Sequence, residues 1–274
     1  MRINRSTCSS VLAAAILLCA ATATHAKIAG NTLAPDKLAA NTAGASRLAA
    51  SNLAVQQLGP NEYVLDPGAA GALLATENGR EVLSFIVACA LPEAVTVFAT
   101  AADGTVYEFF GELGLASEWL DHPLREAGRG WVSACLFARV NDYGVPEALS
   151  MRGQNKALAV SPAEAATFTF EEGAFYGDYF VTQGAPVEIA CRGEGQASGE
   201  LGGLVLRDCT EPDPADPTHT RCDFSYAGDC GDFAPEHACK QFSPHDFYRK
   251  CQDHPVGTSG SKAFGEVITV FVLP

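Results

Sequence analysis

The centre of the chain carries apolar residues with two different periods. A proline ends "NGREVLSFIVACALP", and its apolar residues recur at helical spacing as Val82, Phe85, Ile86 and Cys89. This spacing predicts an amphipathic helix. The next stretch, "AVTVFATAADGTVYEFFG", has two runs rich in β-branched and aromatic residues on either side of a turn at residues 102–104. We therefore expect a β-hairpin after the helix.

A second helix and several strands follow. In "LREAGRGWVSACLFARVNDYG" a helix would carry four apolar residues on one side, Trp131, Cys135, Ala138 and Val140. "SPAE" at residues 161–164 has a capping Ser, a Pro at the first helical position and a Glu three residues after the cap, which predicts a helix start. We expect strands in "PEALSMRG", "KALAV", "VEIAC" and "EVITVFVLP". The last is apolar enough to be a central or well-covered strand.

These elements predict an α+β fold. We expect a compact mixed domain with at least two helices and several antiparallel strands, followed by a disulfide-rich irregular segment. The chain divides into a signal peptide (1–26), a pentad-repeat arm (27–60), a mixed core (61–190) and a disulfide-rich segment (191–274). The last segment ends in a core strand and forms one unit with residues 61–190.

The arm has a period of five. One phase holds Ile28, Leu33, Leu38, Ala43, Leu48, Leu53 and Leu58. A period of five matches neither 3.6 nor 2, so no single helix or strand keeps these residues on one face. The pattern resembles the pentapeptide-repeat family, whose A-(N/D)-L-x-x units form a four-sided β-helix, although here Ala follows the apolar residue. We favour an Ala-rich, loosely ordered arm, with a small stacking or docking module as the alternative.

Residues 1–26 have the organisation of a secretory signal peptide. Two arginines precede the apolar stretch "VLAAAILLCAATAT", and "THA" ends in a small residue. The apolar stretch is shorter than the roughly 20 residues that span a bilayer. We expect cleavage before Lys27, with lipid attachment at Cys19 as the alternative, which the leucine before it disfavours. No later stretch is apolar enough to predict a transmembrane segment.

The charge of the chain limits its partners. The formal net charge is −14 at pH 7. A surface of this sign repels phosphate backbones and anionic lipids, so we expect no binding to nucleic acid or to a membrane surface. The partner that we expect is an unknown protein or glycan, in the periplasm, at the cell surface or outside the cell.

The cysteines predict disulfides. Eight follow the signal peptide: Cys89, Cys135, Cys191, Cys209, Cys222, Cys230, Cys239 and Cys251. An even number in an exported chain favours disulfide bonds, and no two have the short spacing of a zinc site or a C-x-x-C motif. Cys89 and Cys135 would join the two predicted helices. The other six allow fifteen pairings, and we leave these open.

We expect no cofactor and no transition-metal site. The histidines after the signal peptide lack ligand spacing; they are His122, His219, His237, His245 and His254. Asp213 and Asp216 in "PDPADPTHT" are candidate calcium ligands, although the loop lacks the EF-hand pattern. The alternative for these aspartates is a surface loop that prolines hold rigid.

One stretch has the composition of a glycan-cleaving cleft. "YEFFGELGLASEWLDHPL" combines aromatic residues with candidate catalytic groups, namely Glu108, Glu112, Asp121 and His122. Core aromatics beside surface acids give the same pattern. "GTSGS" at residues 257–261 lacks the last glycine of a nucleophile elbow and precedes a strand, so we interpret it as a turn.

Two further segments carry a resemblance. "WVSACLFARVNDYGVPEALSMRG" and "EEGAFYGDYF" resemble parts of uncharacterised secreted bacterial proteins that are cysteine-rich toward the C-terminus. The resemblance implies export and disulfides but no activity. In the second segment, Tyr176, Asp178 and Tyr179 either form the edge of a ligand site or pack in the core.

These observations favour an exported, non-catalytic protein of the cell envelope or the secreted fraction that binds a partner or glycan. The main alternative is a secreted hydrolase, directed at glycans, that uses the carboxylates of residues 108–122. A third hypothesis is a structural protein whose arm stacks with like chains.

Overall fold

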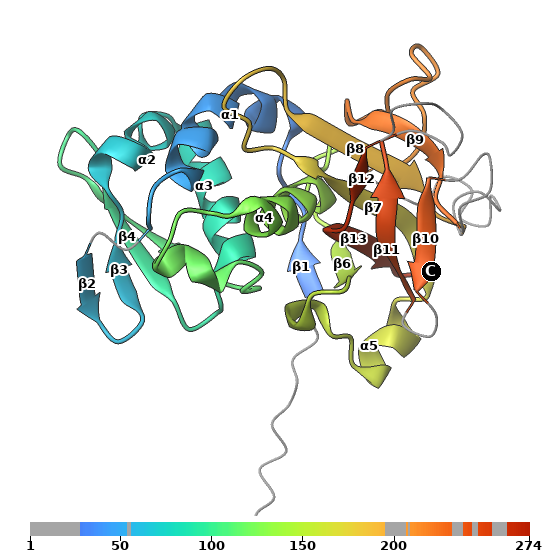
Figure 1. Cartoon of the computed structure of the whole chain (residues 1–274), viewed down its shortest axis with the longest axis horizontal. Helices are drawn as coiled ribbons and strands as arrows, with labels where there is room; N and C mark the ends of the chain where they lie inside the picture. Colours follow the sequence, from blue (N-terminus) through green and yellow to red (C-terminus); the bar gives the residue numbers. More distant parts are fainter. Residues whose placement is uncertain are drawn as a thin grey trace, which may run out of the picture.

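The fold is that of a computed structural model (Figure 1). The structure describes residues 28–53, 56–194, 207, 209–231, 238–242, 246–253 and 262–274. Several predictions fall outside these residues: the signal peptide with Cys19, the "GTSGS" turn, and His237, His245 and His254.

The helices whose full bounds the structure describes lie before residue 168, and the described strands form three sheets. The helices are α1 Pro35–Ala49, α2 Pro67–Leu74, α3 Glu77–Ala90, η1 Ser117–Leu120, α4 Glu126–Ala138, η2 Lys156–Leu158 and α5 Pro162–Thr167. A six-stranded sheet has the order β1 Ile28–Gly30, β6 Ala148–Arg152, β13 Val267–Val272, β7 Phe170–Asp178, β8 Val187–Arg192, β9 Ser225–Asp229. A four-stranded sheet contains β2 Gln56–Gly59, β3 Glu62–Val64, β4 Thr96–Thr100 and β5 Val106–Phe110, and a three-stranded sheet contains β10 Cys239–Phe242, β11 Phe247–Gln252 and β12 Ala263–Phe264. The predicted α+β class is confirmed.

Strand β13 is central to the six-stranded sheet. It pairs antiparallel with both β6 and β7, although these neighbours lie about a hundred residues earlier in the chain. Every residue of β13 is buried. An unbroken apolar run is typical of a strand covered on both faces, and the prediction made from "EVITVFVLP" is confirmed.

Two hydrophobic cores lie on the two faces of this sheet. Helix α4 packs against β7 and β13 on one face, and β11 packs against β13 on the other. Along β7, Phe175 belongs to the core on the α4 side, while its neighbours Ala174 and Tyr176 belong to the second core with Tyr248 of β11. The alternation follows from the period of two along a strand.

The four-stranded sheet, with helices α2 and α3, forms the other end of the molecule. There α2 and α3 pack against β4 and β5 of the four-stranded sheet. Helix α1 contacts α2 and α3, and α3 contacts α4. Figure 1 accordingly shows α4 between this end and the six-stranded sheet.

Most of the predicted elements are present. The predicted first helix is α3, the hairpin is β4–β5, and the second helix is α4. The Ser161 hydroxyl accepts a hydrogen bond from the Glu164 amide at 3.1 Å and caps α5 as predicted. The strand predicted for "KALAV" is wrong: residues 156–158 form the 3-10 turn η2. Its start is capped by Asn155, whose side chain accepts from the Ala157 amide, and such local bonding competes with a strand.

The predicted arm is folded in its described part, which corrects the loosely ordered interpretation for residues 35–49. These residues form α1, with Pro35 at the first turn and Leu38, Ala45 and Leu48 buried. The pentad phase is not kept on one face, because Ala43 is exposed between Leu38 and Leu48. The helix instead packs against the core through residues that its period of 3.6 places on one face, including Leu38, Ala45 and Leu48.

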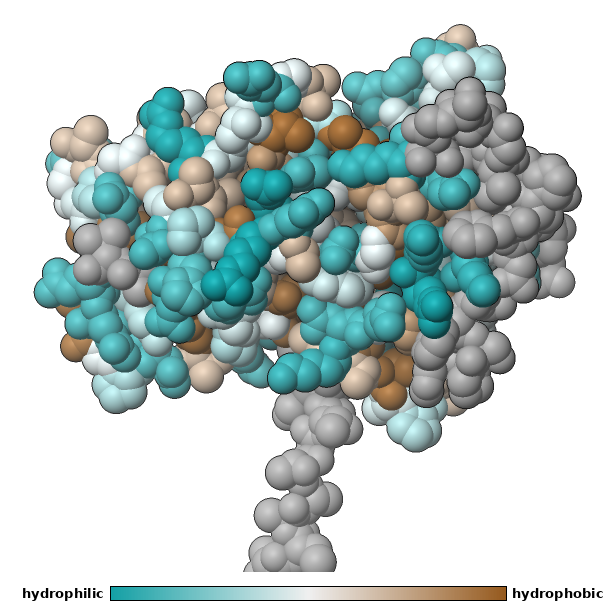
Figure 2. Space-filling model, in the orientation of Figure 1, coloured by the Kyte–Doolittle hydropathy of each residue, from teal (hydrophilic) through white to brown (hydrophobic). Residues whose placement is uncertain are grey.

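The surface is mainly polar. On the face shown in Figure 2, hydrophobic residues form only small, separate areas. The large apolar side chains that are exposed are Leu58, Val106, Phe110, Tyr143, Val145 and Leu273. Among the helices that the structure describes, none has the length and apolar character needed to cross a bilayer.

Four disulfides join the eight cysteines that follow residue 26. Cys89 of α3 is bonded to Cys135 of α4, which confirms the predicted pair. The other bonds are Cys191–Cys230, Cys209–Cys222 and Cys239–Cys251. The six later cysteines therefore pair only among themselves and fix the irregular segment.

A buried ion pair holds this segment to the core. Arg207 and Glu172 of β7 are fully buried and share two hydrogen bonds, of 2.7 and 2.6 Å. The remaining guanidinium nitrogen, Nη1, donates to the carbonyl of Ala138, the last residue of α4, and to that of Val140. Because a buried charge needs both a counter-charge and hydrogen bonds, Arg207 ties together the sheet, the end of α4 and the cysteine-rich segment.

Candidate ligand-binding site

The structure disperses the predicted catalytic residues. Glu108 is exposed on β5, and Asp121 and His122 are exposed after η1. Glu112 accepts a hydrogen bond from the buried guanidinium of Arg139 at 2.8 Å. None of the four lines any of the three cavities described here. The predicted cleft at residues 108–122 therefore receives no support from this arrangement.

The candidate calcium ligands have local roles. Asp213 accepts a hydrogen bond from the Ala215 amide at 2.8 Å. Asp216 accepts from the hydroxyl and amide of Thr218, at 2.6 and 3.1 Å, and these bonds, with one to His219, lower its pKa. In the described part of the chain no three carboxylates lie close enough together to share an ion. These aspartates stabilise turns of an exposed loop.

The "FYGDYF" residues pack in the core. Tyr176 and Tyr179 are fully buried. The Tyr176 hydroxyl donates to the carbonyl of Gln252 at 2.7 Å, and the Tyr179 hydroxyl donates to that of Leu38 at 2.6 Å. Burial raises the pKa of both phenols. The second tyrosine therefore fixes the position of α1 against the six-stranded sheet.

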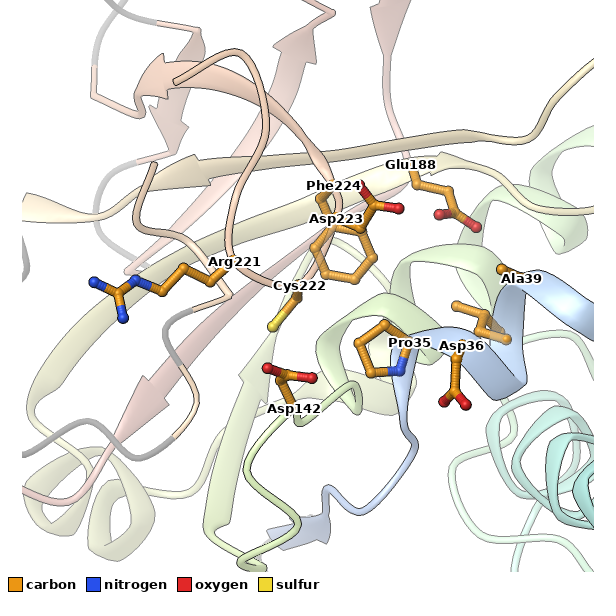
Figure 3. Close-up of a pocket in the computed structure, with 10 residues that line it drawn as sticks. Pro35, Asp36, Ala39, Asp142, Glu188, Arg221, Cys222, Asp223 and Phe224 are labelled. Atoms are coloured by element: carbon orange, nitrogen blue, oxygen red, sulfur yellow. The ribbon is translucent and has the colours of Figure 1, made fainter. Parts of the chain in front are cut away.

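That contact borders a cavity of about 320 Å³. It is lined by residues from four separate segments: Pro35, Asp36, Leu38, Ala39, Asp142, Glu188, Arg221, Cys222, Asp223 and Phe224. Four of these carry carboxylates and one carries a guanidinium. We call it the acidic cavity (Figure 3). Two other cavities, beside Arg152 and beside Ser46, have volumes of about 350 and 550 Å³, but neither is lined by a carboxylate.

Glu188 is the unusual group in the acidic cavity. It lies on β8, and its Oε1 is buried with no hydrogen-bond partner among the described residues. Burial, together with the negative charge of Asp223, raises the pKa of Glu188 to about 7. Figure 3 shows its carboxylate beside that of Asp223. A buried acceptor without a donor carries a free-energy cost that a ligand donor would relieve.

A tight turn positions Asp223. The Thr220 amide donates to the Phe224 carbonyl at 2.7 Å, and the Asp223 amide donates to the Thr220 carbonyl at 2.9 Å. The turn places Asp223 at φ 65°, in the left-handed region that non-glycine residues rarely occupy. Such strain persists where the surrounding structure enforces it, and here the neighbouring Cys209–Cys222 disulfide constrains the turn.

The opposite wall is also well ordered. The buried side chain of Asn141 donates to the Val145 carbonyl at 2.6 Å and accepts from the Tyr143 amide at 2.9 Å. These bonds fix the loop that carries Asp142. Asp36 lies in the first turn of α1. Figure 3 shows the Arg221 guanidinium directed away from the four carboxylates.

The arrangement suits a cationic group better than a metal ion. The carboxylates surround the cavity without converging to metal-ligand distance, as judged over the described residues. The buried side chains of Leu38 and Phe224 supply an apolar floor. Fixed polar groups beside an apolar floor are also found in small-molecule sites.

The sequence did not reveal this site. Its signal was a glutamate in the otherwise apolar strand "VEIAC", together with aspartates in two turns, "VNDYG" and "RCDF". Nothing in the sequence indicates that these segments meet. Comparisons with protein-family models, with curated proteins and with solved structures find no match to this chain.

Proposed function

We propose that this chain is an exported, non-catalytic binding protein whose acidic cavity receives an organic cation, either a small amine or a basic side chain of a partner. The observation that carries the proposal is the buried Oε1 of Glu188 beside Asp223, which has no hydrogen-bond partner among the residues that the structure describes. An ammonium or guanidinium group supplies both the missing donor and the opposite charge.

The volume of the cavity and the negative charge of the chain agree with an organic cation as the ligand. Its volume of about 320 Å³ is near the lower end of the range for ligand pockets. The net charge of −14 attracts cations at long range. The apolar floor favours a cation with a short hydrocarbon or aromatic part over a hydrated inorganic ion.

Export is supported by the covalent structure. Four disulfides persist best in an oxidising compartment. A rigid, cross-linked scaffold also suits binding, since pre-formed sites lose less entropy when the ligand binds.

The test is calorimetric titration of the full chain at pH 8 with benzylammonium and with the uncharged benzyl alcohol. We expect the cation to bind at least about tenfold more tightly, a difference of about 1.4 kcal/mol. Glu188→Gln should remove most of that difference, whereas Glu93→Gln, at an exposed site away from the cavity, should not. Equal affinities for the two probes, or no binding of either, would contradict the proposal.

A hydrolase is the second candidate, and one observation favours it. A carboxyl group with a pKa of about 7 beside a second carboxylate is the arrangement used in general acid–base catalysis. We would assay aryl glycosides with the unmodified chain and with Glu188→Gln. Turnover that disappears in the variant would establish this candidate at Glu188 instead of at residues 108–122.

A further inference from the structure

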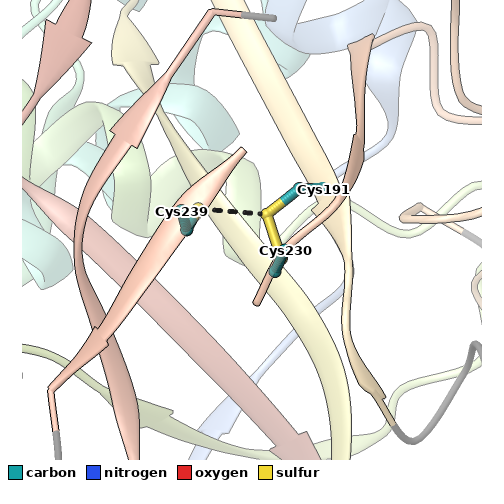
Figure 4. A group of neighbouring side chains, drawn as sticks. All are labelled: Cys191, Cys230 and Cys239. Carbon is teal, nitrogen blue, oxygen red and sulfur yellow. Dashed lines mark hydrogen bonds between the residues drawn. A yellow bond between two sulfur atoms is a disulfide. The ribbon is translucent and has the colours of Figure 1, made fainter. Parts of the chain in front are cut away.

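Two of the disulfides touch each other in the second core. Cys191–Cys230 and Cys239–Cys251 are both buried, and the sulfurs of Cys191 and Cys239 are 3.4 Å apart (Figure 4). The sulfurs of Cys191, Cys230 and Cys239 all lie within 4.8 Å of one another, and the fourth, of Cys251, is bonded to the third. We call these four residues the sulfur cluster.

The backbone holds the sulfur cluster together independently of the S–S bonds. The Cys230 amide donates to the Arg192 carbonyl of β8 at 2.8 Å. Cys239 and Cys251 are direct partners across β10 and β11. The Ala238 amide donates to the Asp229 carbonyl at 2.8 Å, which connects the two pairs. The four side chains therefore stay close when the disulfides are opened.

The distances among three of the four sulfurs approach those of a zinc tetrathiolate. Zinc–sulfur bonds of about 2.3 Å in a tetrahedron place neighbouring sulfurs about 3.8 Å apart. The contact of 3.4 Å between Cys191 and Cys239 is close to this value, and the sulfurs of Cys191, Cys230 and Cys239 all lie within 4.8 Å of one another. Zinc binding requires the two bonded pairs to separate and the Cys251 sulfur, which is bonded to that of Cys239, to turn toward the other three.

We propose that reduction of these two disulfides turns the sulfur cluster into a binding site for one zinc ion. Each disulfide takes two electrons and two protons from a dithiol, which itself becomes a disulfide. The four thiols then lose four protons as the thiolates bind Zn²⁺. The resulting site carries a charge of −2, which the exposed ammonium groups of Lys240 and Lys250 on the same two strands partly offset.

The proposal is specific to these four cysteines. Cys89–Cys135 joins two helices in the first core, and Cys209–Cys222 lies beside the acidic cavity. In the described part of the chain, the group of metal-ligating side chains that gathers at ligand distance consists of Cys191, Cys230 and Cys239 of the sulfur cluster. Reduction opens all four disulfides alike, but zinc should bind only the cysteines of the sulfur cluster.

The first experiment uses the unmodified full chain. The protein is reduced anaerobically with dithiothreitol, desalted, and treated with N-ethylmaleimide with and without one equivalent of zinc. Peptide mapping should show that zinc protects Cys191, Cys230, Cys239 and Cys251 while the other four cysteines are alkylated. Uniform alkylation of all eight, or protection of the other four, would overturn the proposal.

The second experiment gives a spectroscopic readout with matched variants. Reduced chain titrated with Co²⁺ should show the visible absorption of a tetrahedral thiolate site at one ion per chain. Cys89→Ser with Cys135→Ser should retain this spectrum, whereas Cys191→Ser with Cys239→Ser should lose it. Both variants keep six of the eight cysteines that follow residue 26, so equal spectra from the two would refute the assignment.

Discussion

At the scale of single residues, two buried charges have opposite consequences. Arg207 and Glu172 satisfy each other with two hydrogen bonds. Glu188 has an oxygen to which no described residue donates a hydrogen bond, and a neighbouring carboxylate that repels it. The first arrangement is structural, and the second is a site that a ligand can complete.

The stability of the chain should depend on the charge of Glu188. Its pKa is about 7 in the folded protein and near its ordinary value of about 4.5 when unfolded. Burial therefore disfavours the charged form, and the destabilisation is absent below about pH 4.5, grows as the pH rises, and is complete above about pH 7. Glu188→Gln should raise the Tm at pH 8 and leave it nearly unchanged at pH 4.5. Glu93→Gln serves as the control, and a Tm gain that is equal at both pH values would contradict the assignment.

Breaking the buried ion pair should be costly. Arg207→Met leaves Glu172 buried without its partner, and we expect a loss of about 3–5 kcal/mol in the free energy of unfolding. Adding Glu172→Leu should recover much of that loss, because an apolar pair replaces an isolated charge. Urea unfolding measures the free energy of unfolding of the single and the double variant, and Arg125→Met, at an exposed position, serves as the control. A double variant no more stable than Arg207→Met would show that the charge is not the cause.

At the scale of elements, the spacing of apolar residues predicted helices and strands correctly where a segment had a single period. The period of 3.6 predicted α3 and α4, and the apolar run predicted β13. The arm carried two patterns, and the period of five obscured a helix start: Pro35 at the first turn followed by Asp36. The short "KALAV" run resembled a strand, but Asn155 turns the backbone locally.

The arm offers a matched pair of leucines for a test of this helix. Leu48 and Leu58 share one pentad phase, yet Leu48 is fully buried and Leu58 is 55% exposed. Leu48→Ala should reduce the free energy of unfolding by about 2–5 kcal/mol through the cavity that it leaves. Leu58→Ala should have little effect. Similar losses at both positions would favour a repeat that uses each leucine alike.

At the scale of the whole molecule, the sequence predicted one disulfide pair but not the acidic cavity. The Cys89–Cys135 bond followed from two helices that share a core. The other pairs did not follow, since the irregular segment has no period from which to judge proximity. The acidic cavity depends on four segments that meet only through tertiary contacts, and a single sequence does not indicate such contacts.

Export has a direct test in the mass of the whole chain. We expect protein isolated from its native host under non-reducing conditions to begin at Lys27 and to lack the hydrogens that four disulfides remove. Intact-mass spectrometry before and after reduction measures both features. A chain that keeps residues 1–26, or that carries free thiols, would contradict the assignment of compartment.

The position of β13 has a consequence for assembly. β1 and β6 pair with each other, and β7, β8 and β9 pair in succession, but the two groups meet only across β13. Without β13, the sheet would therefore consist of two half-sheets with no ladder between them. The strand that joins them follows every cysteine in the sequence, so all four disulfides link residues that precede it. A chain that ends at Phe264 should therefore contain every cysteine pair and yet fail to close the six-stranded sheet.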